Sequence, residues 1–169
     1  MTLPEENIPR VCFTGHRDFE PGERELASER LARLLRRLAD EKGTRDFYAG
    51  GAMGFDTLAE LAVLDLRRER PDVRLHLILP CRDQCHRWSE EDRALYADIL
   101  TAADSAVVIA PYYYNGCMLV RDRELVASAD LCVALMRPGT ASGGTAYTVR
   151  CAGHAGLPVI NLLGEGYDL

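Results

Sequence analysis

The sequence predicts an α/β fold: a single Rossmann-like domain whose mainly parallel sheet of about six strands carries helices on both faces. Short apolar runs alternate along the whole chain with longer segments of helical periodicity. Strict alternation favours parallel strands, because parallel neighbours are joined by crossover helices. The length of 169 residues suits one domain, which we expect to span residues 1–169.

The first half of the chain supplies three predicted strands and two predicted helices. Strands are expected over residues 11–15, 46–50 and 73–80. The first helix is expected over residues 21–40, and its apolar face consists of Leu31, Leu34, Leu35 and Leu38. The second helix begins at Phe55, carries apolar residues at helical spacing and ends before Pro71.

The second half continues the alternation. Strands are expected over residues 105–110, 130–136 and 158–163, with helices over residues 116–128 and 145–155. Ser89, with Asp92 three residues later, resembles a capping box and predicts a helix that runs to about Leu100.

Composition excludes several classes of protein. The net charge of −6 disfavours non-specific nucleic-acid binding, which depends on Lys and Arg neutralising phosphates. The sequence has no uninterrupted apolar run of the roughly 20 residues that a membrane span needs. Its acidic, polar start is unlike a signal or transit peptide, so we expect a cytoplasmic protein with six reduced cysteines.

Three loops are candidates for a binding site, because ligands of open parallel sheets bind beyond the carboxyl ends of the strands. They are "TGHR" after the first predicted strand, "GGAMG" after the second and "GTASGG" after the fifth. Glycines at such turns let backbone N–H groups approach an anion at a helix start. We therefore expect Gly50, Gly51 and Gly54 to bind phosphate or ribose; the alternative is a tight turn that needs positive φ angles.

The other two loops offer polar and charged groups. In the third, Gly143, Gly144 and Thr145 open a helix, where the threonine hydroxyl either binds phosphate or caps the helix. In the first loop, Gly15 and His16 precede Arg17. This arginine either clamps a phosphate or forms a surface ion pair.

Asp56 lies in the first turn of the second predicted helix. It either accepts a ribose hydroxyl or complements the helix dipole. The spacing of the glycines before it is not that of the dinucleotide fingerprint, and no acidic residue ends the next strand.

Neither a metal nor a cofactor is expected. Cys81, Cys85 and His86 lack the second pair of ligands that a structural zinc site requires. Tyr112–Tyr114 either stack on a base or, as we prefer, form a surface or interface loop, which is compatible with a homodimer.

Two of these loops resemble motifs of the SLOG superfamily, the Rossmann-like group that includes the DprA DNA-processing proteins and the "lonely guy" (LOG) phosphoribohydrolases. "FTGHR" resembles the opening motif of its bacterial YpsA-like branch. "GGAMGFDTLAE" is similar to the glycine–aspartate motif which that branch shares with DprA. The resemblance covers nearly the whole chain and implies a nucleotide-type pocket.

A third match concerns LOG enzymes. In "CMLVRDRELVASADLCVAL", Met118, Arg121, Ala129 and Asp130 fit the LOG pattern, and the resemblance implies that Arg121 corresponds to the catalytic arginine. The following glycine turn is longer than in LOG enzymes, and Thr148 stands where their glutamate is expected. Cleavage of an N-glycosidic bond normally needs a carboxylate to stabilise an oxocarbenium-like centre.

We therefore expect a protein that binds or senses a nucleotide or an ADP-ribose-like ligand, rather than an enzyme. One alternative is a nucleotide-processing hydrolase that uses another carboxylate, such as Asp56 or Glu60. A second alternative is DprA-like binding of single-stranded DNA, which the acidic balance disfavours.

Arg121 lies on an apolar helical stripe with Cys117, Met118 and Leu125, so its guanidinium should face the sheet and meet an anion. The anion is either a protein carboxylate or a ligand phosphate. Of the two we favour the phosphate, which predicts that Arg121→Ala lowers ligand affinity and leaves the ligand-free stability nearly unchanged.

Overall fold

The computed structural model describes residues 3–165 and 167, which form six strands and five helices in alternation. The strands are β1 (Arg10–Gly15), β2 (Asp46–Ala49), β3 (Arg74–Cys81), β4 (Ser105–Ala110), β5 (Leu131–Leu135) and β6 (Val159–Asn161). The helices are α1 (Glu23–Glu41), α2 (Phe55–Glu69), α3 (Glu90–Ala102), α4 (Cys117–Ala127) and α5 (Gly144–His154). Every predicted element is confirmed. The outer limits of the expected domain, residues 1 and 169, lie outside the described residues.

The strands form one sheet in the order β4-β3-β2-β1-β5-β6, and every pairing is parallel. The predicted parallel sheet is therefore confirmed. β1 lies inside the sheet, where Val11 is opposite Phe47 of β2 on one side and Leu131 of β5 on the other. The order of the strands reverses between β1 and β5, and such a reversal opens a crevice in which ligands bind.

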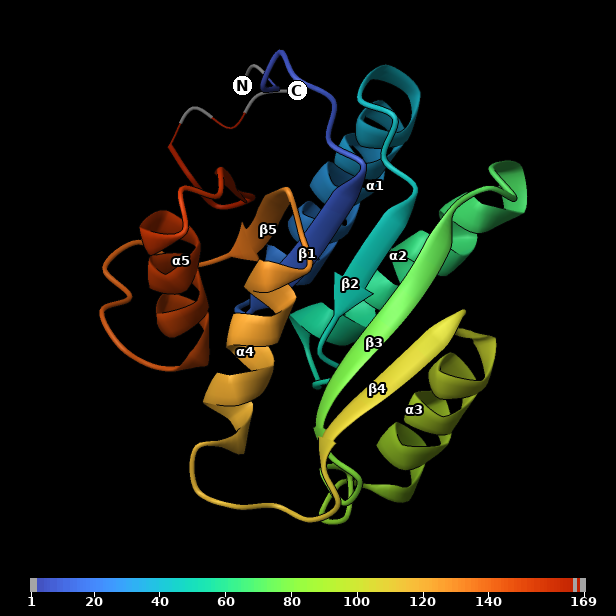
Figure 1. Ribbon diagram of the computed structural model, residues 1–169, viewed down its shortest axis with the longest axis vertical. Coiled ribbons are helices and arrows are strands. Elements are labelled where there is room, and N and C mark those ends of the chain that lie inside the picture. Colours follow the sequence, from blue (N-terminus) through green and yellow to red (C-terminus); the bar gives the residue numbers. More distant parts are fainter. Residues whose placement is uncertain (1–2, 166, 168–169) are drawn as a thin grey trace.

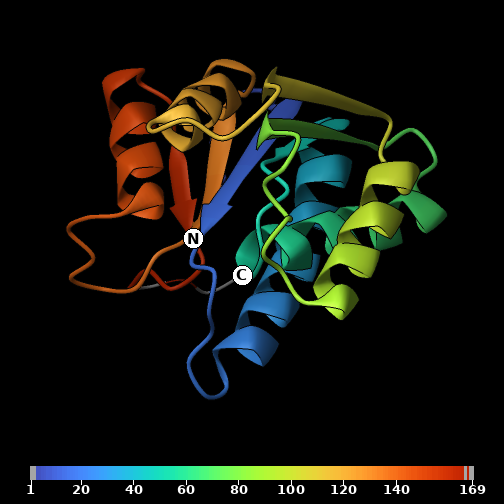
Figure 2. The ribbon, with the colours of Figure 1, turned by 90° about the horizontal axis from the view of Figure 1, so that it is seen from below.

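Helices cover both faces of the sheet. α4 and α5 lie in front of it in the view of Figure 1. Figure 2 shows α1, α2 and α3 on the opposite face. The larger apolar core lies beneath α1 and α2 and includes Leu34, Phe13 and Phe47, and a smaller core beneath α4 contains Cys12 and Leu125. Packing on both faces fixes β1 and β5, and with them the loops at their carboxyl ends.

The last strand, β6, is shorter than predicted, because hydrogen bonds of the Asn161 side chain replace the backbone hydrogen bonds between strands at its end. The Asn161 Nδ2 group donates to the Met136 carbonyl at 2.8 Å, and its Oδ1 accepts from the Met136 N–H at 3.0 Å. The Leu163 N–H also donates to the Asn161 Oδ1, which turns the chain away from the sheet.

α3 begins as the capping pattern predicts but buries little surface. The Ser89 Oγ accepts from the Asp92 N–H at 3.0 Å. Of the 13 residues in α3, only Ile99 is buried, so the helix gives the neighbouring edge strand β4 little cover. None of the described helices is both long enough and apolar enough to span a membrane.

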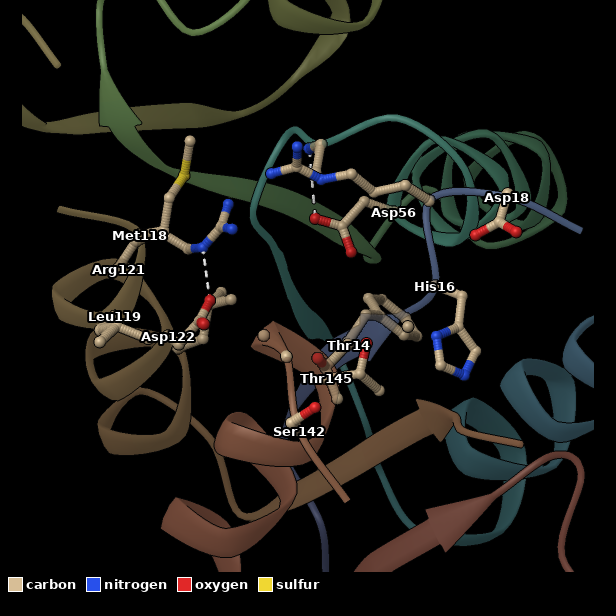
Figure 3. A pocket seen from close by; sticks show the side chains of 17 residues that line it. Thr14, His16, Asp18, Asp56, Met118, Leu119, Arg121, Asp122, Ser142 and Thr145 are labelled. Atoms are coloured by element: carbon tan, nitrogen blue, oxygen red, sulfur yellow. Dashed lines mark hydrogen bonds and ion pairs between the residues drawn. The ribbon is translucent and has the colours of Figure 1, made fainter. Parts of the chain in front are cut away.

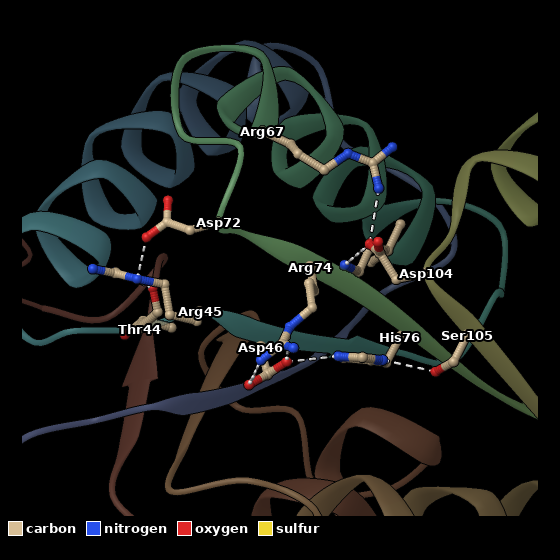
Figure 4. A network of polar contacts seen from close by, with 10 residues as sticks. Thr44, Arg45, Asp46, Arg67, Asp72, Arg74, His76, Asp104 and Ser105 are labelled. Carbon is tan, nitrogen blue, oxygen red and sulfur yellow. Dashed lines mark hydrogen bonds and ion pairs between the residues drawn. The ribbon is translucent and has the colours of Figure 1, made fainter.

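Polar side chains tie β2, β3 and β4 together near their amino ends (Figure 4). His76 lies between Asp46 and Ser105, with Nε2 at 2.8 Å from the Asp46 Oδ1 and Nδ1 at 2.7 Å from the Ser105 Oγ. Arg74 also pairs with Asp46, at 2.9 Å. These contacts stabilise the pairing of the three strands.

Candidate functional site

A cavity of about 470 Å³ opens at the point where the strand order reverses. The loop after β1, the helix α4 and the start of α5 surround it, and Figure 3 shows Asp56, Arg121, Asp122 and Thr145 directed toward this space. The structure brings eight of the predicted site residues into the lining: Gly15, His16, Arg17, Asp56, Arg121, Gly143, Gly144 and Thr145.

The other three predicted residues, Gly50, Gly51 and Gly54, do not line this cavity. The Gly50 N–H donates to the Asp56 Oδ2 at 3.2 Å, and the Gly51 N–H donates to the Glu60 Oε1 at 3.0 Å. Two of the amides expected to bind an anionic ligand thus bind carboxylates of α2. These hydrogen bonds hold the "GGAMG" loop against α2, and this geometry does not favour direct phosphate binding by these glycines.

Close packing explains why glycine occupies this loop. A Cβ at Gly54 would lie 2.4 Å from the backbone of Arg17, and a Cβ at Gly50 would lie 2.1 Å from the Arg121 Nη1. The absence of side chains lets the loop approach both the "TGHR" segment and the buried guanidinium. The Phe55 N–H donates to the His16 carbonyl at 3.0 Å and fixes the same approach.

Arg121 faces the interior as predicted, with 6% of its surface exposed. Its Nε donates to the Asp122 Oδ1 at 2.7 Å, and its Nη1 donates to the Gly50 carbonyl at 2.6 Å. A protein carboxylate, that of Asp122, therefore already accompanies the guanidinium. This geometry favours the structural interpretation of Arg121, so its removal should lower the stability of the ligand-free protein.

His16 links the loop after β1 to the loop after β5 by a hydrogen bond. Its Nε2 accepts from the Arg137 N–H at 3.1 Å, which leaves Nδ1 to carry the proton in the neutral ring. The loop after β1 is thereby linked to the segment after β5. The ring also lines the cavity, so its position depends on both loops.

Asp122 is a site residue that the sequence did not reveal. Adjacent helical residues are about 100° apart, so the stripe that points Arg121 inward gave no reason to expect its neighbour in the same cavity. The structure buries Asp122, and a Cβ at Gly144 would lie 3.8 Å from its Oδ2. Its carboxylate therefore faces the start of α5.

Negative charge is in excess in the interior around this site. Burial raises the pKa of Asp56 despite the opposing effects of Arg121 and two backbone N–H groups. Burial likewise raises the pKa of Asp122. The pKa of Glu60 lies well above its usual value because the side chain is buried, and repulsion from Asp56 raises it further. One buried guanidinium thus faces three carboxyl groups, which favours retention of protons.

The Glu60→Gln variant is expected to gain stability over the wild type as the pH rises from the usual pKa of a glutamate through the raised pKa of folded Glu60. The pKa of Glu60 is higher in the folded than in the unfolded state. At pH values between these two pKa values, the folded state therefore keeps a proton on Glu60 that the unfolded state has lost. Stability from this group is present at low pH and is lost as the pH rises through the folded pKa. Glutamine keeps an oxygen for the Gly51 N–H and carries no charge.

Urea unfolding of both proteins across this pH range measures the effect. A suitable control is Glu69→Gln at the end of α2, because Glu69 is exposed and its carboxylate pairs with Arg36. This control should show no such gain as the pH rises, since the pairing with Arg36 lowers the pKa of Glu69. A Glu60→Gln advantage that stays constant with pH would contradict the raised pKa.

The cavity also contains groups that favour an anion. α5 has Gly143 as its N-cap residue and no capping hydrogen bond from a described side chain, and Gly143, Gly144 and Thr145 line the cavity. Arg17 lines the cavity, and no ion pair of the described residues involves it. The cavity therefore offers an anion a helix N-terminus and a guanidinium that no ion pair of the described residues occupies.

Comparison with known families decides what kind of protein has this site. The YpsA family, described as the YspA SLOG family, matches residues 11–154. The chain belongs to this family. The SLOG resemblance of the sequence is therefore confirmed.

Relatives of this YpsA-family chain include UPF0398 proteins of several bacteria. The protein of Bacillus pumilus is 30% identical over 136 residues, which cover 76% of this chain and 73% of that protein. A UPF0398 protein of Staphylococcus epidermidis is 28% identical over 116 residues, which cover 64% of this chain and 61% of that protein.

Two solved structures share the fold of this YpsA-family chain. DNA processing protein A from Helicobacter pylori, described for its single-stranded DNA binding, superposes with a TM-score of 0.61 and 21% identity over 90% of this chain and 64% of that one. TM1055, a structural genomics target, superposes with a TM-score of 0.54 and 22% identity over 89% of this chain and 71% of that one. At these identities the likeness establishes the fold.

Position 148, where the LOG resemblance expects a glutamate, does not line the cavity in this YpsA-family chain. Thr148 is fully buried, and its hydroxyl donates to the Gly144 carbonyl at 2.9 Å. The carboxyl groups that do line the cavity are Asp18, Asp56 and Asp122. Among residues 3–165 and 167, no three His, Cys, Asp or Glu side chains are grouped as a metal site.

Proposed function

We propose that this chain binds a nucleotide or an ADP-ribose-like ligand in the cavity between the loop after β1 and the start of α5. The observation that carries the proposal is that the lining divides into two kinds of groups. Arg17 and the first N–H groups of α5 offer positive charge and hydrogen-bond donors. Asp56 and Asp122 offer acceptors. A ligand with both a phosphate and sugar hydroxyls matches this division.

The start of α5 suits the phosphate. Backbone N–H groups at a helix N-terminus, together with the helix dipole, favour anions. The planar guanidinium of Arg17 can bind two phosphate oxygens at once. Thr145, the second residue of the helix, adds a hydroxyl in the same lining.

Asp56 suits the sugar. Its Oδ2 already accepts from the N–H groups of Gly50 and Ala52, both at 3.2 Å. Among the described residues no group donates a hydrogen bond to its Oδ1. Every buried side-chain oxygen of these residues has a hydrogen-bond partner, so an oxygen without a partner must be accessible. The Asp56 Oδ1 is therefore accessible from the cavity that Asp56 lines. A ribose hydroxyl is a suitable donor for such an oxygen. The cavity volume of about 470 Å³ lies within the range of sites for small ligands.

Hydrolysis of a nucleotide is the second candidate function. Asp56 and Asp122 contribute two carboxyl groups to the cavity, and burial raises the pKa of each. A carboxyl group that retains its proton can act as a general acid. Incubation with AMP, ADP and ADP-ribose followed by chromatography separates the two functions, because binding alone releases no product.

A melting-temperature panel tests the binding proposal. AMP, ADP or ADP-ribose is expected to raise the melting temperature of the wild type, because a ligand at 100 times its Kd adds about 2.7 kcal/mol. The Arg17→Ala variant should bind about 10-fold or more weakly, since hydrogen bonds to charged groups contribute about 1.5–3 kcal/mol. Its ligand-free melting temperature should match the wild type, because Arg17 is exposed.

Arg68→Ala is the matched control for this panel. Arg68 is exposed on α2, pairs only loosely with Asp65 at 3.6 Å and does not line the cavity. It should bind the ligand as the wild type does. No shift with any nucleotide, or equal shifts for wild type and Arg17→Ala, would contradict the proposed site. A shift produced only by single-stranded DNA, with a steep salt dependence, would instead favour DNA binding.

A further inference from the structure

Exposed apolar side chains gather at one edge of the molecule. Among the large apolar residues that the structure shows exposed, seven lie on α3, on β4 and in the segment after β4: Leu95, Leu100, Val107, Val108, Tyr112, Tyr113 and Tyr114. A concentration of exposed apolar side chains of this kind is typical of sites of protein association. We refer to Ser105–Tyr114, which contains β4, as the β4 edge.

β4 is the outermost strand and pairs only with β3. Successive strand residues point to opposite faces, yet Val107 is 58% exposed and Val108 is 38% exposed. Val107 lies on the face that carries α4, which leaves it uncovered, and Val108 lies on the face of the loosely packed α3. The strand therefore exposes both of its faces and its outer row of backbone groups.

The β4 strand has none of the features with which proteins usually protect an edge. Its sequence, "SAVVIA", contains no charge and no proline, and every residue from Ser105 to Ala110 is in regular strand conformation. Edge strands are normally protected by lysines, prolines, bulges or a covering segment. An unprotected apolar edge is a template for pairing with a strand of another chain.

We propose that β4 pairs in antiparallel orientation with β4 of a second copy of this chain, about a two-fold axis that passes between the two Val108 residues. In this register Val108 lies opposite Val108 of the second copy, and Val107 lies opposite Ile109 of the second copy, so that the residues of each pair share one face of the sheet. Apolar side chains then meet apolar side chains along the whole strand. The two sheets become one sheet, and both outer rows of backbone groups gain hydrogen-bond partners.

Charge favours a second copy over an unrelated partner. In a two-fold interface each residue near the axis approaches its own counterpart, so a charged residue there would meet a like charge. The β4 edge carries no Asp, Glu, Lys or Arg over ten consecutive residues, in a chain in which 27% of residues are charged. The tyrosines that follow the strand extend the uncharged surface.

This interface does not involve the proposed ligand site. The cavity lies between the ends of β1 and β5, and β2 and β3 separate β1 from β4. The test of self-association can therefore succeed or fail independently of any nucleotide experiment.

Sedimentation velocity over a range of concentrations tests the pairing. The wild type, with a chain mass of 18.8 kDa, is expected to sediment as a dimer. Val107→Lys and Val108→Lys each place like charges beside the axis, and each should raise the dimer dissociation constant about 100-fold or more. Leu26→Lys is the matched control, because Leu26 is 39% exposed on α1, away from the β4 edge, and it should remain a dimer.

Hydrogen–deuterium exchange of the wild type provides a second measurement that needs no variant. Backbone amides of Ser105–Ala110 should exchange more slowly at high than at low protein concentration. Three results would overturn the proposal: a wild type that stays monomeric at every concentration, a dimer that both lysine variants preserve, or a dimer in which these amides exchange at the monomer rate.

Discussion

Replacing Arg121 with alanine is expected to lower the free energy of unfolding of the ligand-free protein by about 3–5 kcal/mol. The guanidinium is buried and bonded both to the Asp122 carboxylate and to the Gly50 carbonyl. Its loss leaves the carboxylates of Asp56 and Asp122 without their positive neighbour in a buried setting. An uncompensated buried charge is much more costly than a lost surface contact.

A double-mutant cycle with Asp122→Asn shows whether the pair is responsible. Asparagine removes one of the uncompensated charges, so the double variant should recover part of the stability that Arg121→Ala loses. Arg68→Ala, on the exposed surface of α2, should change the stability by less than about 0.5 kcal/mol. Urea unfolding measures all four variants. If ligand-free Arg121→Ala is as stable as the wild type, the structural interpretation of Arg121 is wrong, and its function is to bind the ligand phosphate.

Replacing Gly54 with alanine is expected to lower the free energy of unfolding by about 3 kcal/mol, through backbone strain and overpacking together. Gly54 has φ 80° and ψ −122°, a conformation that residues with a Cβ rarely adopt. The added Cβ would also lie 2.4 Å from the backbone carbonyl of Arg17. Because a backbone segment cannot rotate away as a flexible side chain can, the "TGHR" loop must move.

Gly22→Ala separates strain from packing. Gly22 has φ 78° and ψ −9°, and a Cβ there would meet nothing within 4 Å. The variant should lose only the roughly 1–2 kcal/mol of a left-handed residue. Gly54→Ala should also weaken nucleotide binding by displacing Arg17, whereas Gly22→Ala should not. Equal melting temperatures for the two variants would show that close packing of the two loops does not matter.

The spacing of apolar residues was sufficient to predict the fold, because the residues that the structure buries are mostly those at the apolar positions of each helix and strand. The face formed by Leu31, Leu34, Leu35 and Leu38 is buried as expected, and the apolar runs became strands of one parallel sheet. The end of β6 was the exception, since the Asn161 side chain makes bonds there that no periodicity reports.

The site was harder to predict, because its contacts join distant segments. The predicted parallel sheet placed the loops after β1 and β5 at the carboxyl ends of their strands, and both loops line the cavity. Which groups satisfy the glycine amides depends on the position of α2 relative to its own loop, so the roles of Asp56 and Glu60 at Gly50 and Gly51 could not be read from spacing. Asp122 was missed for a similar reason, since only the tertiary structure places it opposite α5.

A crystal structure of the protein with the nucleotide that most raises its melting temperature tests the central claim most directly. The account predicts a phosphate within hydrogen-bond distance of the first N–H groups of α5 and of the Arg17 guanidinium, with a sugar hydroxyl donating to Asp56. A phosphate bound instead to the N–H groups of Gly50 and Gly51, or a nucleotide outside this cavity, would contradict it.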